Sequence, residues 1–161
     1  MDVDRTTVQP ALAVVLVRRI VGAEMSNVAD VFAVLAGCVL LFASVSESVL
    51  FKNQAVHQGI SEVRTADLPP QRWWSFHLGV YSVFLGAAPI IGVIAEHTHH
   101  PHVARTLVLY GCACIFLGGI VLALSNRRAS EKEKEAGMVA ALAMCVPAII
   151  AIVTELIAWL A

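Results

Sequence analysis

Apolar residues gather into four long runs along the chain, separated by more polar segments. The runs cover about residues 28–50, 76–95, 105–124 and 136–160. Each is about 20 residues or longer, the length at which an α-helix crosses the hydrocarbon core of a bilayer. A helix on the surface of a soluble protein would instead carry a polar stripe at the helical period. The pattern therefore predicts an all-α integral membrane protein, an antiparallel four-helix bundle.

Composition and charge support this prediction and add an orientation. The 161 residues are 58% hydrophobic and only 14% charged, whereas a soluble domain of this size needs more polar surface. With four spans, seven of the 11 Lys and Arg residues fall on the side that carries segments 51–75 and 125–135. The positive-inside rule then places these loops in the cytoplasm of a bacterial cell and segment 96–104, with the carboxyl terminus, outside the plasma membrane.

The pattern divides the chain into an amino-terminal extension, residues 1–24, and a four-helix domain, residues 25–161. The extension is unlike a signal peptide, because its start is acidic and two arginines follow its short apolar run. It is either an amphipathic helix in the membrane interface or a segment read from an upstream start codon, since Met25 stands just ahead of the first span. Asn27 and Asp30 are residue types that cap helices, which predicts that the first span begins near them.

Several classes of function find no support in the sequence. It has no phosphate-binding glycine loop, no dinucleotide fingerprint and no zinc-protease motif. The basic residues are few and mixed with acids, which argues against a nucleic-acid partner. All four cysteines lie in predicted spans, where free cysteine acts as a small apolar residue. These observations favour a protein that is not an enzyme, and they identify no cofactor.

Ionisable residues within predicted spans are costly and therefore mark candidate sites. Glu47 and His77 lie near the cytoplasmic ends of the first two spans, and Tyr81 follows His77 by one helical turn on the same face. The three side chains are predicted to form a hydrogen-bonded cluster that holds a ligand head group or passes a proton. The alternative is that Glu47 extends to the interface and pairs with Lys52 while His77 simply lies in the head-group layer.

The segment EHTHHPH, residues 96–102, places four histidines between two apolar runs. Imidazole and carboxylate groups suit zinc, copper, nickel or iron, which makes this outer face a candidate metal site. The alternative is a polar interfacial loop, because Pro101 favours an extended chain and the spacing is not that of a structural zinc site. The candidate ligands are His97, His99, His100, His102 and Glu155.

The second apolar run begins with FHLGVYSVFLG, residues 76–86. This stretch resembles the start of the second helix in domain-of-unknown-function family DUF1304, whose pattern there is close to N-Q-G-x-Y-N-x-F-L. The resemblance covers about residues 28–160, and it implies a four-helix fold of a small bacterial membrane protein with no established activity. The positions that match the pattern are Gly79, Tyr81, Phe84 and Leu85.

This chain also departs from the family pattern. The family's Asn–Gln pair is His77–Leu78 here, its second Asn is Ser82, and no Gln–Gly pair precedes Pro147 in the last helix. A glutamate late in the family's first helix resembles Glu47. If the family uses a network of amide side chains, the resemblance implies that the network is altered in this protein.

Three functional hypotheses follow. The first is a membrane protein that binds a lipid-like ligand or a membrane partner through Glu47, His77 and Tyr81. The second is a redox or metal protein that holds a haem, a quinone or a divalent metal through His77 or the outer histidines. The third is a small proton-coupled transporter that acts as a homo-oligomer with Glu47 as its coupling carboxylate. Bound metal or a coloured preparation would support the second hypothesis over the first. An oligomer in which Glu47 faces a cavity would support the third.

Overall fold

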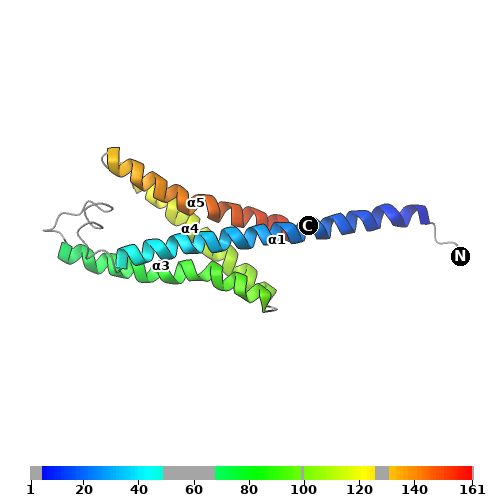
Figure 1. Cartoon of the computed structure of the whole chain (residues 1–161), viewed down its shortest axis with the longest axis horizontal. Helices are drawn as coiled ribbons and strands as arrows, with labels where there is room; N and C mark the ends of the chain where they lie inside the picture. Colours follow the sequence, from blue (N-terminus) through cyan, green and yellow to red (C-terminus); the bar gives the residue numbers. More distant parts are fainter. Residues whose placement is uncertain (1–4, 49–67, 99, 126–130, 161) are drawn as a thin grey trace.

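The computed structural model is a bundle of four long helices, and it describes residues 5–48, 68–98, 100–125 and 131–160. Successive helices run in opposite directions (Figure 1). All four are long and apolar enough to cross a membrane, which confirms the predicted all-α membrane bundle. The helices are α1 (Arg5–Ser48), α3 (Leu68–His97), α4 (Pro101–Ser125) and α5 (Glu131–Leu160).

The helices form a ring in which each contacts two neighbours. α1 and α4 both pack against α3 and α5, whereas α1 and α4 meet each other little across the diagonal. Small residues line the inner face of α1, where Ala29, Ala33 and Ala36 have no exposed surface. They allow the backbones to approach, which matters because dispersion contacts hold transmembrane helices together where lipid tails are equally apolar. Ile115 of α4 and Ala148 of α5 complete the core.

Two glycines set the closest approach of α1 and α3. A Cβ atom on Gly37 would lie 2.5 Å from the carbonyl oxygen of Gly86, and a Cβ atom on Gly86 would lie 2.9 Å from the carbonyl oxygen of Gly37. The two backbones therefore touch at this crossing. A similar approach joins α3 and α4, where a Cβ atom on Gly111 would lie 2.6 Å from Cδ of Pro89.

The helix boundaries differ from the predicted ones at two places. α1 begins at Arg5 and continues through the predicted boundary at residues 24–25, so neither Asn27 nor Asp30 caps it. α3 extends to His97 and α4 begins at Pro101. The loop that contains the histidines is therefore shorter than predicted, and His102 lies in the first turn of α4. Pro101 is the first residue of this helix, a position where proline is favoured because its missing N–H group has no hydrogen-bond partner to lose.

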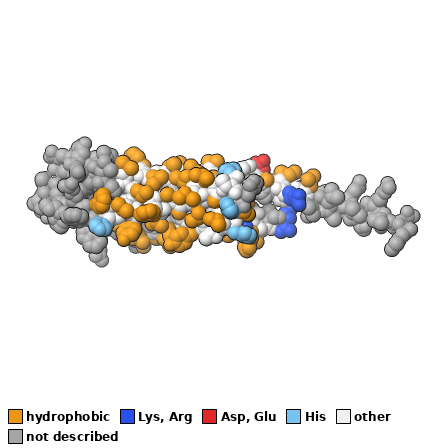
Figure 2. Space-filling view, turned by 90° about the horizontal axis from the view of Figure 1, so that it is seen from below, with side chains coloured by type: hydrophobic (Ala, Val, Ile, Leu, Met, Phe, Trp, Pro, Cys, Tyr) orange, Lys and Arg blue, Asp and Glu red, His pale blue; other side chains and the backbone are white. Residues whose placement is uncertain are grey.

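The outer surface of the bundle is an apolar belt. Large apolar side chains such as Phe42 and Phe84 are 74% and 69% exposed. Figure 2 shows this belt in orange, with histidine side chains at both of its edges. Side chains of this kind are stable only in contact with lipid or another apolar partner, so the belt is the surface that the bilayer covers.

One buried hydrogen bond joins α1 and α3 near their loop ends. The hydroxyl of Ser44 is 1% exposed and donates to the carbonyl oxygen of Gly79 at 2.7 Å. We expect Ser44→Ala to lower the free energy of unfolding by about 0.6 kcal/mol, the mean for interhelical hydrogen bonds in membranes. The matched control is Ser46→Ala, because Ser46 donates to Phe42 within its own helix. Unfolding in a denaturing detergent measures both, and equal losses would contradict an interhelical role for Ser44.

Candidate functional site

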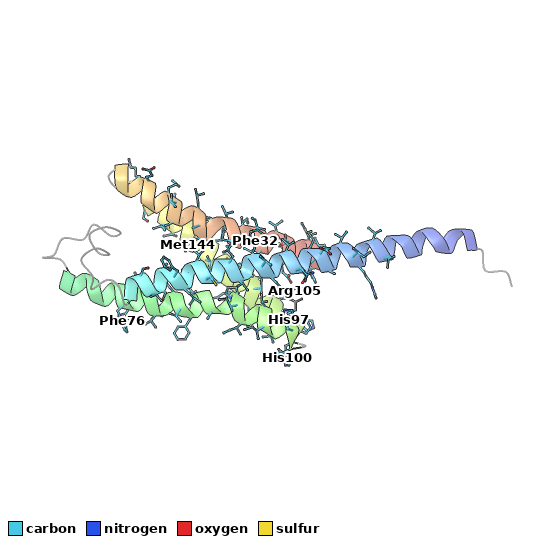
Figure 3. The ribbon with its side chains drawn as sticks, in the orientation of Figure 1. Phe32, Phe76, His97, His100, Arg105 and Met144 are labelled. Atoms are coloured by element: carbon cyan, nitrogen blue, oxygen red, sulfur yellow. The ribbon has the colours of Figure 1, made fainter. Side chains whose placement is uncertain are left out.

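Polar side chains from all four helices meet at one end of the bundle, which we call the polar end. It comprises Ser26 and Asp30 of α1, Glu96 of α3, Arg105 of α4 and Glu155 of α5. Figure 3 shows Arg105 beside His97 and His100 at this end, whereas Phe76 lies at the opposite end. Each residue lies close to the end of its membrane-spanning segment except those of α1, which continues past the bundle.

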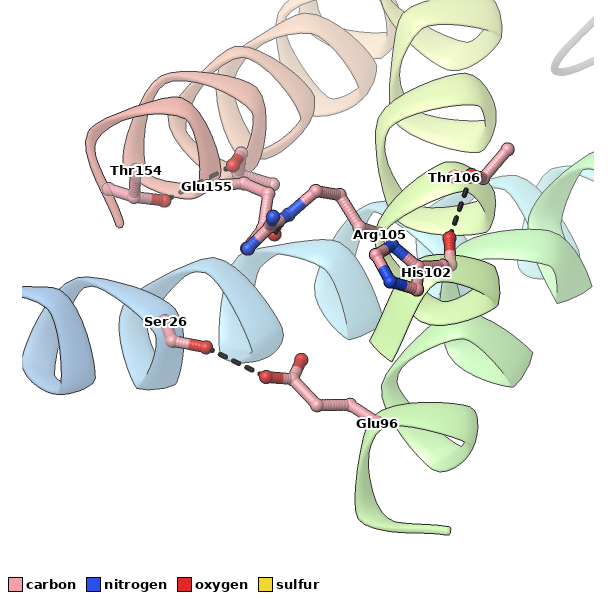
Figure 4. Close-up of polar contacts among 8 residues, drawn as sticks. Ser26, Glu96, His102, Arg105, Thr106, Thr154 and Glu155 are labelled. Carbon is pink, nitrogen blue, oxygen red and sulfur yellow. Dashed lines mark hydrogen bonds and ion pairs between the residues drawn. The ribbon is translucent and has the colours of Figure 1, made fainter. Parts of the chain in front are cut away.

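An ion pair between α4 and α5 is the most buried part of the polar end. Nε of Arg105 donates to Oε1 of Glu155 at 2.8 Å (Figure 4). The Glu155 side chain is 6% exposed, whereas that of Arg105 is 41% exposed. A carboxylate in an apolar surrounding needs a charged partner. Arg105 therefore neutralises Glu155 while its own side chain stays partly exposed at the end of the bundle.

A second polar contact joins α1 and α3. Ser26 Oγ donates to Oε1 of Glu96 at 3.1 Å (Figure 4). Asp30 follows Ser26 by four residues and so lies on the same face of α1. Its carboxyl group lies close to the carboxyl group of Glu96 and interacts electrostatically with Glu96, His97 and Glu155. Two carboxyl groups this close need a proton or a cationic group between them.

The polar end contains more acidic than basic groups. Three carboxyl groups, those of Asp30, Glu96 and Glu155, share it with the guanidinium group of Arg105, and the guanidinium group of Arg18 lies beside the end of α5. Among the residues of the polar end, the ion pair is the one between Arg105 and Glu155. Asp30 and Glu96 are thus left to interact with each other, with Ser26 and with the imidazole of His97. The arrangement suits a positively charged group at the level of Asp30 and Glu96.

A further cation holds the amino-terminal part of α1 to the polar end. Nη2 of Arg18 donates to the carbonyl oxygen of Leu160, at the end of α5. The last carbonyl groups of a helix have no partner within the helix, and they favour a nearby positive charge. Arg18 therefore supplies a hydrogen-bond donor and a positive charge to the carbonyl end of α5.

The predicted cluster of Glu47, His77 and Tyr81 lies at the opposite end of the bundle. The contact of Ser44 with Gly79 brings the end of α1 to the level of His77, as expected for antiparallel neighbours. His77 and Tyr81 are exposed, and the ring of His77 meets Phe76 edge to face at 6.2 Å. The Glu47 side chain lies outside the described residues, so the cluster stays a prediction.

Three of the predicted metal ligands, all histidines, lie on the surface near the polar end. His97, His100 and His102 are exposed, and His99 lies outside the described residues. Glu155 pairs with Arg105. Within the described part of the chain, no three His, Cys, Asp or Glu side chains are arranged to hold a metal ion. A metal site that includes His99 stays a prediction.

Sequence reasoning missed three residues of the polar end. Ser26 was not considered, Asp30 was interpreted as a helix cap, and Arg105 contributed only to the count of basic residues. Because α1 begins at Arg5, Asp30 lies within the helix and its carboxyl group is free to face α3. The available signal was that Asp30, Arg105 and Glu155 all fall near the same end of their apolar runs.

Comparison with known proteins gives a family and no function. No curated protein and no solved structure matches the chain. The sequence model of one family, described as "Protein of unknown function (DUF1304)", matches residues 34–156. The matched region includes Glu96, Arg105 and Glu155, and it leaves out Ser26, Asp30 and the extension. Because the match covers most of the four-helix bundle, it confirms the resemblance seen in the second helix: the chain belongs to the DUF1304 family.

Proposed function

We propose that this protein binds a lipid-like amphiphile with a positively charged head group, and that the head group lies at the polar end. The observation that carries the proposal is the contact between the carboxyl groups of Asp30 and Glu96 at the edge of the apolar belt. Neither forms an ion pair with any described residue. In this proposal the protein is a binding protein and not an enzyme.

The chemistry of the two carboxyl groups selects the head group. An ammonium group donates up to three hydrogen bonds and replaces the proton that would otherwise keep Asp30 and Glu96 together. The site is near the bilayer surface, where electrostatic attraction is stronger than in bulk water. An anionic head group would instead meet an excess of negative charge.

The apolar belt selects the rest of the ligand. On α3, Ile91 and Ile94 lie within two turns of Glu96 and are 52% and 57% exposed. A ligand whose head lies at Glu96 therefore has its tail at the depth of these side chains. Burial of acyl carbons against such surfaces gives affinity, and the carboxyl groups give orientation.

The cluster of Glu47, His77 and Tyr81 is the second place where we propose a polar ligand contact. His77 and Tyr81 lie at the other end of the belt, and the proposed cluster would be less acidic because it contains one carboxylate, one imidazole and one phenol. A single amphiphile in one leaflet contacts one end only. Variants at the two ends of the belt can therefore be compared in one experiment, with each end as the control for the other.

Thermal unfolding of the detergent-purified protein tests the proposal. The probes are a long-chain primary amine, the alcohol of equal chain length and the corresponding alkyl phosphate. We expect the amine to raise Tm most. We expect the variant Asp30→Asn/Glu96→Gln to bind the amine at least tenfold more weakly, because a single charge-assisted hydrogen bond contributes about 1.5–3 kcal/mol and 1.4 kcal/mol corresponds to tenfold in affinity.

The control is the variant His77→Ala/Tyr81→Phe, which changes the other end of the belt and should keep the full response to the amine. Equal Tm shifts from the amine and the alcohol would contradict a charged head-group site. Loss of the response in the control, but not in Asp30→Asn/Glu96→Gln, would move the site to the opposite end.

A further inference from the structure

The ion pair at the polar end leaves part of the Arg105 side chain available to a ligand. A guanidinium group has five N–H donors, and all but one of them belong to its two terminal nitrogens. Arg105 donates to Glu155 through Nε, and Glu155 is its one hydrogen-bond partner among the described residues. The Arg105 side chain is also 41% exposed. Its terminal nitrogens can therefore donate to a group that approaches the polar end from outside.

Further basic side chains surround Arg105. Figure 3 shows His97 and His100 beside it, and both are exposed. His102 is exposed as well, and it precedes Arg105 by one turn of α4. An imidazole ring donates at least one N–H group. The surface of the polar end therefore presents hydrogen-bond donors beside the exposed residue Glu96.

The acidic pair and the guanidinium group of Arg105 are neighbours with separate partners. Asp30 interacts electrostatically with Glu155, which is the residue that Arg105 contacts. Glu96 accepts a hydrogen bond from Ser26. The polar end thus offers two binding regions of opposite charge, the carboxyl groups of Asp30 and Glu96 and the guanidinium group of Arg105. A lone ammonium group occupies only the first of these regions.

A head group that carries both charges contacts both regions. Arginine binds phosphate through parallel hydrogen bonds from its planar guanidinium group, and a primary ammonium group donates to carboxylates. We propose that the ligand of the polar end is an aminophospholipid, whose ammonium group binds Asp30 and Glu96 and whose phosphate accepts hydrogen bonds from Arg105.

This assignment rests on the proposed function, since it requires that Asp30 and Glu96 hold an ammonium group. The two charges of such a head group cancel, so the phosphate adds no net negative charge to an end that already has an excess of carboxyl groups. The acyl chains lie against the apolar belt, which begins beside Glu96 with Ile94, 57% exposed.

Affinities measured in a nonionic detergent test the phosphate contact in the unaltered protein. The probes are lysophosphatidylethanolamine, a primary amine of equal chain length and lysophosphatidylcholine, whose quaternary ammonium group has no N–H donor. The dependence of Tm on ligand concentration gives each affinity. We expect lysophosphatidylethanolamine to bind at least tenfold more tightly than the amine, because it contacts both regions. Lysophosphatidylcholine should bind at least tenfold more weakly than lysophosphatidylethanolamine, because it donates no hydrogen bond to Asp30 or Glu96.

Two variants remove the phosphate contact. Arg105→Leu/Glu155→Leu removes one charge of each sign, so the net charge of the polar end stays the same, and it should lower the preference for lysophosphatidylethanolamine over the amine to about threefold or less. Arg105→Lys keeps a cation beside Glu155 but lacks the planar fork of donors, and it should lower the preference at least threefold. The matched control is Arg19→Ala, which removes an exposed arginine of α1 and should keep the full preference.

Failure of the phosphate contact and failure of the proposed function give different results. Equal affinities for lysophosphatidylethanolamine and the amine would overturn the phosphate contact, and so would a full preference in Arg105→Leu/Glu155→Leu. Amine binding that is unchanged in Asp30→Asn/Glu96→Gln would contradict the proposed function itself. Glycerophosphoethanolamine has the same head group without an acyl chain and should bind at least tenfold more weakly than lysophosphatidylethanolamine. Equal affinity for these two probes would overturn the assignment of the ligand as a lipid.

Discussion

Replacement of Arg105 with alanine should destabilise the bundle more than any other single change to a charged residue that the structure describes. The variant leaves the carboxylate of Glu155, 6% exposed, without its ion-pair partner. Breaking a buried ion pair by removing one member costs about 3 kcal/mol or more. Unfolding in a denaturing detergent, followed by circular dichroism, measures the loss.

Two variants separate the ion pair from a general effect of charge. Arg19→Ala removes an exposed arginine of α1 and should change the free energy of unfolding by less than 0.5 kcal/mol or so. The double variant Arg105→Leu/Glu155→Leu should recover most of the stability, because apolar residues of similar volume replace buried ion pairs at little cost. A double variant as unstable as Arg105→Ala would contradict this account of the pair.

Replacement of Gly37 with alanine should force α1 and α3 apart. The new Cβ atom would lie 2.5 Å from the carbonyl oxygen of Gly86, and a backbone atom cannot move aside as a side chain can. Overpacking of this kind costs about 1–3 kcal/mol. Gly86→Ala should act in the same direction, because its Cβ atom would lie 2.9 Å from the carbonyl oxygen of Gly37.

The matched control is Gly118→Ala on α4. Its Cβ atom would meet only Cε of Met144 at 3.5 Å, an ordinary contact. Alanine is favoured over glycine in helices by about 1 kcal/mol, so this variant should be neutral or more stable. The same unfolding assay measures all three variants. A loss in Gly118→Ala as large as that in Gly37→Ala would show that the crossing of α1 and α3 is not the cause.

The spans could be predicted from the sequence because hydrophobicity alone determines them. Four runs of the length that a bilayer requires leave few alternatives, and the helices observed include all four runs except residues 49–50, which lie outside the described part. The interior of α1 was less predictable. Capping residue types at Asn27 and Asp30 suggested a helix start, but the polar residues before them did not interrupt the helix.

Helix pairing could not be predicted from the sequence. Gly92, Gly111 and Gly119 lie against neighbouring helices, whereas Gly118 has an open face. Gly37 and Gly86, which make the closest crossing, were not recognised. Small residues are frequent in all four runs, and the sequence does not say which of them face each other.

The candidate site shows the same limit. Glu155 was recognised as a costly charge within a span, but its partner was sought among nearby histidines. Arg105 reaches it because α4 and α5 are neighbours in the ring and antiparallel. Asp30 and Glu96 come together through the packing of α1 against α3. Charges on different helices have no spacing in the sequence that relates them, so only the arrangement of helices reveals the polar end.

Native mass spectrometry of the protein extracted from its own membrane is the most direct test of the proposed function. It should detect a bound amphiphile, and tandem fragmentation should show a basic head group. The species should be absent or strongly reduced in Asp30→Asn/Glu96→Gln and retained in His77→Ala/Tyr81→Phe. Retention in the first variant, or a bound species whose head group carries only negative charge, would contradict the assignment of the polar end as the site of a positively charged head group.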